Sequence, residues 1–135
     1  MKRPKSKKPG KQRKFLHTAP LHLKRKILSS HLSKELREKY KRRAMPVRKG
    51  DEVQVMSGKL KGKTGKIARV NFKKYRVYLE GVTRKRTVGT EAQISLSPSK
   101  LKIISLNLDD KKRQKIIERK GVKIVTEQPS TVQSK

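Results

Sequence analysis

Cysteine and tryptophan are both missing from the 135 residues of this chain, and its aromatic residues are limited to three Tyr and two Phe. The absence of cysteine excludes disulfide frameworks, thiolate zinc sites and cysteine nucleophiles. Acidic residues are scarce as well, because ten Asp and Glu stand against forty Lys and Arg, for a formal net charge of +30. A chain with this excess repels itself when it is unbound, which predicts a polyanionic partner.

Long apolar runs are missing too. No stretch approaches the roughly 18 apolar residues that a membrane span needs, and the N-terminus lacks the apolar core of a signal peptide. With 31% hydrophobic and 37% charged residues, one small core is possible, and much of the chain must lie outside it. We therefore expect an intracellular protein that has no membrane partner and forms no homo-oligomer.

The N-terminal part is basic and then becomes helical in pattern. The opening stretch MKRPKSKKPGKQRK has no aliphatic residue after its Met, so it buries too little apolar surface to order itself in water. We expect an extended basic arm over residues 1–19. Pro20 suits the first turn of a helix that runs to about Ser30, and Ser33 suits the N-cap of a second helix. A helical extension is therefore expected over residues 20–45.

The pattern changes to period two after Pro46, which predicts a small all-β domain over residues 46–106. The expected strands cover about 53–55, 64–71, 75–79, 92–96 and 101–106. Ile67 and Val70 lie three positions apart, which predicts a bulge. Short, bent strands favour a small barrel, because closure removes exposed sheet edges. The expected core is Val53, Val55, Ile67, Val70, Val77, Leu79, Ile94, Leu101 and Ile103.

The C-terminal part predicts one short helix. Asp109 and Asp110 lie where the positive end of a helix dipole favours acids, and Arg119 and Lys120 lie where its negative end favours cations. We expect this helix within residues 107–120 and a flexible tail over residues 121–135. The predicted fold is thus mainly β, with a helical, basic N-terminal extension and a short C-terminal helix.

Catalytic chemistry finds little support in the sequence. His17, His22 and His31 lack the spacing of a metal pair on one helix face. Asp51 and Glu52 follow a glycine, where turn chemistry and local charge balance explain them. No nucleophile, base and orienting acid come together, so we expect no enzymatic activity, no metal, no cofactor and no small-molecule substrate.

The segment GKLKGKT, residues 58 to 64, invites comparison with a nucleoside-triphosphate loop. That loop requires four residues between its glycines and joins a strand to a helix. Three residues separate Gly58 from Gly62 and strand-like residues follow, so the comparison fails on both counts. We expect positive φ at Gly58 and Gly62, and a close backbone approach or a bulge at Gly65. A hairpin explains these glycines equally well, but only phosphate binding also explains the lysines between them.

Residues 47 to 81, VRKGDEVQVMSGKLKGKTGKIARVNFKKYRVYLEG, resemble a KOW motif. The shared features are an opening Lys-Gly-Asp, a Val-x-Val strand, Gly-x-x-Lys-Gly-x-x-Gly-x-Ile, and a third strand that ends in Glu-Gly. The flanks APLHLKRKILSSHLSKELREKYKRRAMPVRKGDEV and SPSKLKII with LNLDDKKRQKIIERK are similar to the archaeal and eukaryotic form of the twenty-fourth large-subunit ribosomal protein family. Older eukaryotic naming calls this family the twenty-sixth, and the resemblance covers about residues 11–120.

That resemblance implies an SH3-like KOW barrel bound to large-subunit ribosomal RNA near its 5′ region. It further implies early entry into subunit assembly, a position near the exit of the nascent-chain tunnel, and neighbouring ribosomal proteins as partners. The implied location is the cytoplasmic ribosome, with nucleolar assembly if the source is eukaryotic. The main alternative is a transcription or chromatin protein with a KOW-type barrel. It would ordinarily need a further domain for a polymerase partner.

The expected RNA contacts fall into three groups of basic residues. RNA helices hide their base edges in a deep groove, so these residues are expected to follow backbone shape rather than sequence. The arm group is Arg3, Lys5, Lys7, Lys8, Lys11, Arg13 and Lys14. The approach group is Lys24, Arg25, Lys26, Arg42, Arg43, Arg48 and Lys49. The loop group is Lys59, Lys61, Lys63, Lys66, Lys73, Lys74, Arg84, Lys85 and Arg86. Base stacking is expected to be minor, with Tyr78 and Phe15 as the best candidates.

Overall fold

The structure is a computed structural model that describes residues 4–119. Two helices, α1 (Pro9–Thr18) and α2 (Leu21–Ile27), come first, and a third, α3 (Lys34–Tyr40), lies between two short strands. The remaining elements follow in chain order. They are β1 (Ser29–Leu32), β2 (Ala44–Pro46), β3 (Glu52–Val55), β4 (Thr64–Asn71), β5 (Arg76–Lys85), β6 (Glu91–Leu96), a 3-10 turn (Pro98–Lys100), β7 (Leu101–Ser105) and α4 (Lys111–Glu118).

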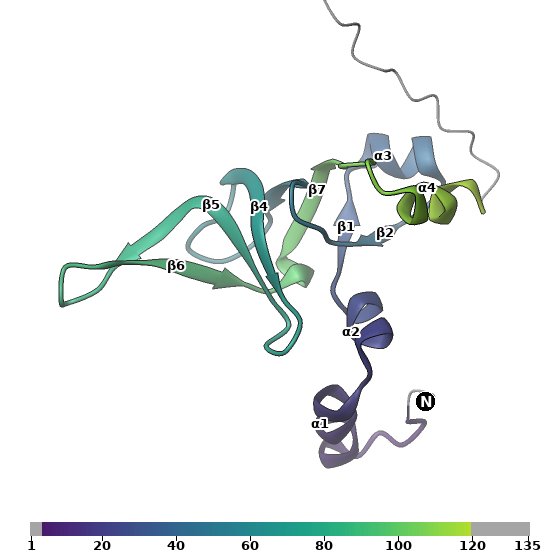
Figure 1. Cartoon of the computed structure of the whole chain (residues 1–135), viewed down its shortest axis with the longest axis horizontal. Coiled ribbons are helices and arrows are strands. Elements are labelled where there is room, and N and C mark those ends of the chain that lie inside the picture. Colours follow the sequence, from purple (N-terminus) through teal and green to yellow (C-terminus); the bar gives the residue numbers. More distant parts are fainter. Residues whose placement is uncertain (1–3, 120–135) are drawn as a thin grey trace, which may run out of the picture.

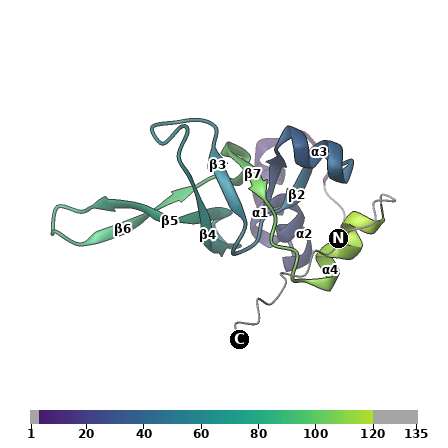
Figure 2. The same cartoon turned by 90° about the horizontal axis from the view of Figure 1, so that it is seen from above.

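The seven strands form one sheet in the order β2-β1-β7-β3-β4-β5-β6. Strands β1 and β7 are parallel, and every other pair is antiparallel. The sheet curls around one core, while the far ends of β5 and β6 project from the body as a long hairpin (Figure 1, Figure 2). The fold is therefore a mainly β, small barrel-like fold with helices at its N-terminal and C-terminal ends, as predicted.

Alternation along the strands builds the core. Seven of the nine predicted core side chains are fully buried, namely Val53, Val55, Ile67, Val77, Leu79, Leu101 and Ile103. The other two, Val70 and Ile94, are half-buried and pack against this cluster from its edge. The pairing of β4 with β5 shifts register between Ile67 and Arg69, which confirms the predicted bulge.

The flanking segments add core residues that the strand pattern did not predict. Leu28, Leu32, Met45 and Ile117 are at most 1% exposed and join the same cluster. They come from the segments around β1 and β2 and from α4. The helical extension and the C-terminal helix are therefore parts of the barrel's packing rather than appendages.

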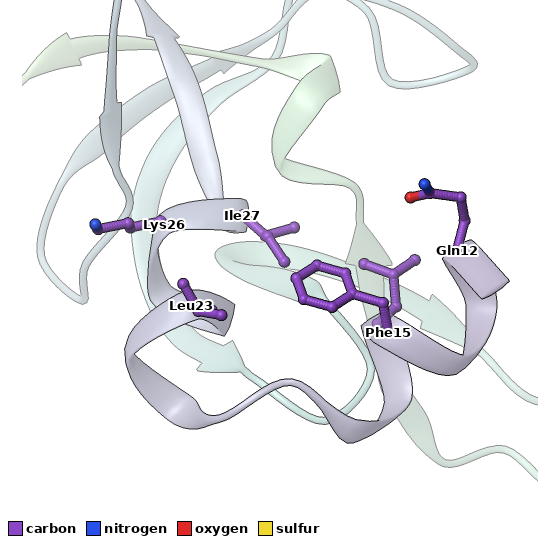
Figure 3. A pocket seen from close by; sticks show the side chains of 6 residues that line it. Gln12, Phe15, Leu23, Lys26 and Ile27 are labelled. Carbon is purple, nitrogen blue, oxygen red and sulfur yellow. The ribbon is translucent and has the colours of Figure 1, made fainter. Parts of the chain in front are cut away.

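The prediction of an extended arm over residues 1–19 is wrong for Pro9–Thr18, which form α1. Pro9 stands in the first turn, where its missing N–H costs no hydrogen bond. Phe15 is only 6% exposed, and Figure 3 shows its ring directed toward Ile27 of α2. Burial of this ring supplies the apolar contact that the preceding residues lack.

The predicted first helix extends too far, because α2 ends at Ile27 and the chain enters β1. Ser30 pairs with Met45 of β2, and His31 pairs with Lys102 of β7. Such a short strand is defined by backbone hydrogen bonds to distant segments, which no local pattern reveals. The second helix is correct, since the Ser33 hydroxyl accepts the Leu36 N–H at 3.3 Å as its N-cap.

Two further boundaries differ from the prediction. The third strand was expected to end at Gly81, but β5 passes through Gly81, with φ +69°, and continues to Lys85. Tyr75 was expected within that strand and instead precedes it with φ +52°. The C-terminal helix begins as predicted, because the Asp110 carboxylate caps α4 by accepting the Lys112 N–H at 2.7 Å. The predicted tail and Lys120 lie outside the described residues.

Candidate nucleic-acid interface

The turn between β3 and β4, residues 56–63, has a backbone shaped by glycine. Gly58 has φ +97° and Gly62 has φ +88°, which are the positive values expected for them. The Lys61 N–H donates to the Gly58 carbonyl at 3.0 Å, and the Gly62 N–H donates to the Val55 carbonyl at 2.9 Å. The β3–β4 turn is thus a compact loop held by its own backbone.

Gly65 has a different role, at the start of β4. A Cβ atom at this position would lie 3.3 Å from the Glu80 carbonyl oxygen, which is closer than a neighbouring backbone normally allows. Of the two alternatives open for Gly65, the structure supports the close approach. The register shift lies further along β4, between Ile67 and Arg69.

Four predicted contact residues project from this part of the structure, and all are exposed: Lys59, Lys61, Lys63 and Lys66. Within residues 4–119 the ion pairs are Arg48 with Asp110 and Arg113 with Asp51. No carboxylate of the described chain therefore neutralises these four lysines. Their ammonium groups and the nearby backbone face solvent as one positive surface.

The turn between β4 and β5 presents a second pair of exposed lysines, Lys73 and Lys74. The Asn71 side chain accepts the Lys74 N–H at 3.0 Å and closes the turn. The Tyr75 hydroxyl donates to the Leu16 carbonyl of α1 at 2.6 Å, and partial burial raises the pKa of this phenol. This contact fixes the second lysine turn against the N-terminal helix.

The hairpin of β5 and β6 carries Arg84, Lys85 and Arg86, all exposed. They were predicted to lie in a loop, but Arg84 and Lys85 belong to β5 and pair with β6. Only Arg86 lies in the tip, where its N–H donates to the Thr90 carbonyl at 2.9 Å. Figure 1 shows this hairpin reaching away from the barrel, so its cations lie far from the other groups.

The arm group is divided between two kinds of backbone. Exposed side chains occur before the first helix and along it: Lys5, Lys7 and Lys8, then Lys11, Arg13 and Lys14. Arg3 lies outside the described residues. Leu16, Leu23 and Ile27 surround Phe15 and leave an apolar hollow of about 490 Å³ between α1 and α2 (Figure 3).

The approach group is also divided, by what its side chains contact. Four members are exposed and available to a partner: Arg25, Lys26, Arg43 and Lys49. Three members are half-buried or already bonded within the protein. Lys24 donates to the His17 carbonyl at 3.3 Å, and Arg42 donates to the Ile116 carbonyl at 2.6 Å. Arg48 forms an ion pair with Asp110.

The two aromatic candidates for stacking differ in outcome. Phe15 was predicted to be an exposed ring, which is wrong because α1 buries it against α2. Tyr78 is half-buried on β5, and the Arg69 guanidinium carbon lies 4.8 Å from the centre of its ring. That distance is within cation–π range.

The sequence interpretation missed one buried polar pair. Asp51 was attributed to turn chemistry and local charge balance, yet it is fully buried and paired with Arg113, which is 2% exposed. The partners lie 62 residues apart, so no spacing rule connects them. An Asp at a strand start and an Arg among apolar helix residues are the only local signals.

Other kinds of site find no support in residues 4–119. No group of three or more His, Cys, Asp or Glu side chains in this part of the chain is arranged to hold a metal ion. The helices described there are also too short and too polar to cross a membrane.

Comparison with known proteins identifies the family. The family model for the eukaryotic ribosomal proteins L26 and their archaeal counterparts matches residues 6–120. The chain belongs to this family. A curated relative, the large ribosomal subunit protein uL24 of Korarchaeum cryptofilum (strain OPF8), is 46% identical over 120 residues, which cover 89% of this chain and 92% of that protein.

Family membership confirms the resemblance recognised in the sequence. It assigns this chain to the non-enzymatic proteins of the ribosome, and the KOW segment corresponds to the barrel-like fold built by β3, β4 and β5. The alternative of a transcription or chromatin protein is therefore set aside. The role of the chain is structural rather than catalytic.

Proposed function

We propose that this protein binds large-subunit ribosomal RNA through contacts with its phosphate backbone. The observation that carries the proposal is that cations occupy each projecting part of the molecule: α1, the β3–β4 turn, the β4–β5 turn and the β5–β6 hairpin. With two ion pairs inside residues 4–119, little of this charge is neutralised by the protein itself. Spaced cations on rigid turns suit the phosphates of several RNA helices at once.

The proposal extends to the place of the protein in the ribosome. The chain supports early assembly of the large subunit, contacts neighbouring ribosomal proteins and lies near the exit of the nascent-chain tunnel. It works in cytoplasmic ribosomes and passes through the nucleolus during assembly if the source is eukaryotic. The name of the korarchaeal relative, a large ribosomal subunit protein, supports this subunit assignment.

Sedimentation of the tagged chain through a sucrose gradient tests the ribosomal role. We expect it to co-migrate with large subunits and complete ribosomes, and to leave them only at high salt. Co-migration with RNA polymerase alone would contradict the proposal. Crosslinks from the three contact groups to ribosomal RNA would then identify the RNA segments involved.

Depletion and nascent-chain crosslinking test the finer claims separately. If the protein acts early, its depletion lowers the yield of large subunits and accumulates their earliest precursors. If it lies near the tunnel exit, a photoreactive group placed on the β5–β6 hairpin crosslinks to stalled nascent chains. Late precursors, or crosslinks to ribosomal RNA alone, would remove the corresponding claim and leave RNA binding intact.

A further inference from the structure

An open groove of about 1070 Å³ lies between β4, the segment from β2 to Lys49, and α4. Its walls come from segments that are far apart in sequence. Val70 and Phe72 line one side, and Ile116 of α4 lines the other. All three are half-buried and pack against the core, so they present a fixed apolar surface at the bottom of the groove.

The rim of this groove is strongly positive. Arg25, Lys49, Arg69 and Lys112 all line it and are exposed. Asp110 is the one carboxylate among the residues that line the groove, and it already pairs with Arg48 and caps α4. An occupant that matches this rim therefore carries several negative charges along its edge and an apolar or aromatic group toward the floor.

Arg69 adds a planar element to the rim. Its guanidinium carbon lies 4.8 Å from the centre of the Tyr78 ring, which holds the group on the sheet surface. Arg69 is itself exposed and lines the groove. Guanidinium planes and aromatic rings are the surfaces on which unpaired RNA bases stack.

We infer that this groove binds an unpaired segment of ribosomal RNA, with a base over Phe72 and Val70 and its flanking phosphates on the basic rim. The inference rests on the proposed RNA-binding function and adds to it a contact with base surfaces. Bases within a duplex are stacked and cannot reach the floor, whereas splayed bases can. An acidic peptide would match the rim but would leave the planar surfaces of Phe72 and Arg69 without a planar partner.

The test compares two RNA probes bound to the full-length chain. One is a labelled, unstructured pyrimidine 12-mer, and the other is a 12-base-pair RNA duplex. Arg69→Gln is compared with Arg76→Gln, which removes the same charge from an exposed residue of β5 that does not line the groove. We expect Arg69→Gln to weaken binding of the unpaired probe about tenfold. We expect Arg76→Gln to change it less than about twofold, and neither variant to discriminate on the duplex.

Phe72 separates base contact from charge. Phe72→Leu keeps an apolar side chain of similar size but removes the ring, so it should fold and still weaken binding of the unpaired probe severalfold. Because the lost contact is uncharged, the slope of affinity against salt should stay the same. A 4-thiouridine in the unpaired probe should crosslink to residues 69–72 in the unaltered chain.

Three outcomes overturn the inference. Equal effects of Arg69→Gln and Arg76→Gln on the unpaired probe, or a crosslink confined to other segments, would show that the groove does not hold RNA bases. Saturable binding of a glutamate-rich peptide that Arg69→Gln abolishes, with RNA binding unaffected, would assign the groove to a protein. Failure of the unaltered chain to bind either RNA probe would instead contradict the proposed function.

Discussion

Arg113 of α4 holds Asp51 through two hydrogen bonds, with Nη1 2.5 Å from Oδ1 and Nη2 2.8 Å from Oδ2. The Asp51 carboxylate also accepts the backbone N–H groups of Arg48 at 2.9 Å and Asn107 at 3.1 Å. Arg113 donates as well to the carbonyls of Asn107 and Pro46. This pair joins the C-terminal helix to the first barrel strand and to the end of β2.

Replacement of Asp51 by Ala should therefore destabilise the protein severely, because it leaves the Arg113 charge buried without its partner. We expect a loss of about 3–5 kcal/mol in the free energy of unfolding. Asp109→Ala removes an exposed carboxyl that precedes α4 and should stay within about 0.5 kcal/mol of the unaltered protein. Urea unfolding measures both, and equal losses would show that the buried pair has no special role.

Tyr75→Phe removes the hydrogen bond between the phenol and the Leu16 carbonyl. We expect a cost of about 1 kcal/mol, concentrated in the attachment of α1. Hydrogen exchange should therefore rise in α1 more than in β3 or β7. Tyr78→Phe is the matched control, since its hydroxyl makes no hydrogen bond within residues 4–119. Unchanged protection of α1 in Tyr75→Phe would contradict this role.

Gly62→Val places a β-branched side chain at φ +88°. The surroundings leave space for it, so the cost comes from the backbone conformation, at about 1–3 kcal/mol. The turn should change shape and RNA affinity should fall although every lysine remains. Thr64→Val introduces the same side chain into extended backbone and should be nearly neutral. Unchanged RNA binding and subunit incorporation by Gly62→Val would refute a special role for this glycine.

The pKa of the Asp110 carboxyl lies below its ordinary value of 3.8, chiefly because it accepts the Lys112 N–H and also because Arg48 is nearby. A lowered pKa in the folded state means that the stabilisation by Asp110 is fully present above about pH 4. It is lost as the pH falls through the lowered pKa. The stability difference between the unaltered protein and Asp110→Asn should be constant from pH 7 to 5 and shrink below pH 4. A constant difference down to pH 2 would contradict this assignment.

The lysines of the β3–β4 turn and of the start of β4 should contribute to the salt dependence of RNA binding. If about ten phosphates are contacted in all, the log–log slope against salt is about −7 to −9. Changing Lys59, Lys61, Lys63 and Lys66 together to Gln should make that slope shallower by about 3. The matched control changes four exposed lysines outside the contact groups: Lys34, Lys39, Lys100 and Lys115. Equal changes in slope would mean that charge alone, and not its position, determines binding.

Periodicity and turn chemistry predicted the barrel because they are local properties. Alternating Val53 and Val55, the spacing from Ile67 to Val70, and the capping residues Ser33 and Asp110 each act within a few residues of the chain. The extended arm was wrong for the opposite reason. Phe15 can only stabilise α1 once α2 is present to cover its ring.

The candidate interface shows the same division. Exposed lysines on glycine turns could be predicted directly, because charge and loop position are visible in the sequence. The groove at Phe72 and Ile116 could not, because its walls are brought together from β4 and α4. The internal bonds of Lys24 and Arg42 were hidden too, since each accepting carbonyl lies outside the local pattern.

The sequence by itself determined the family, the basic character and the mainly β core, because motif spacing, charge and alternation need no knowledge of distant contacts. The tertiary structure alone decided that β1 and β2 extend the sheet, that Asp51 and Arg113 form a buried pair, and that a groove opens beside Phe72. Each of these features joins segments distant in the chain. Their stability comes from burial and hydrogen bonding that exist only after the chain has closed on itself.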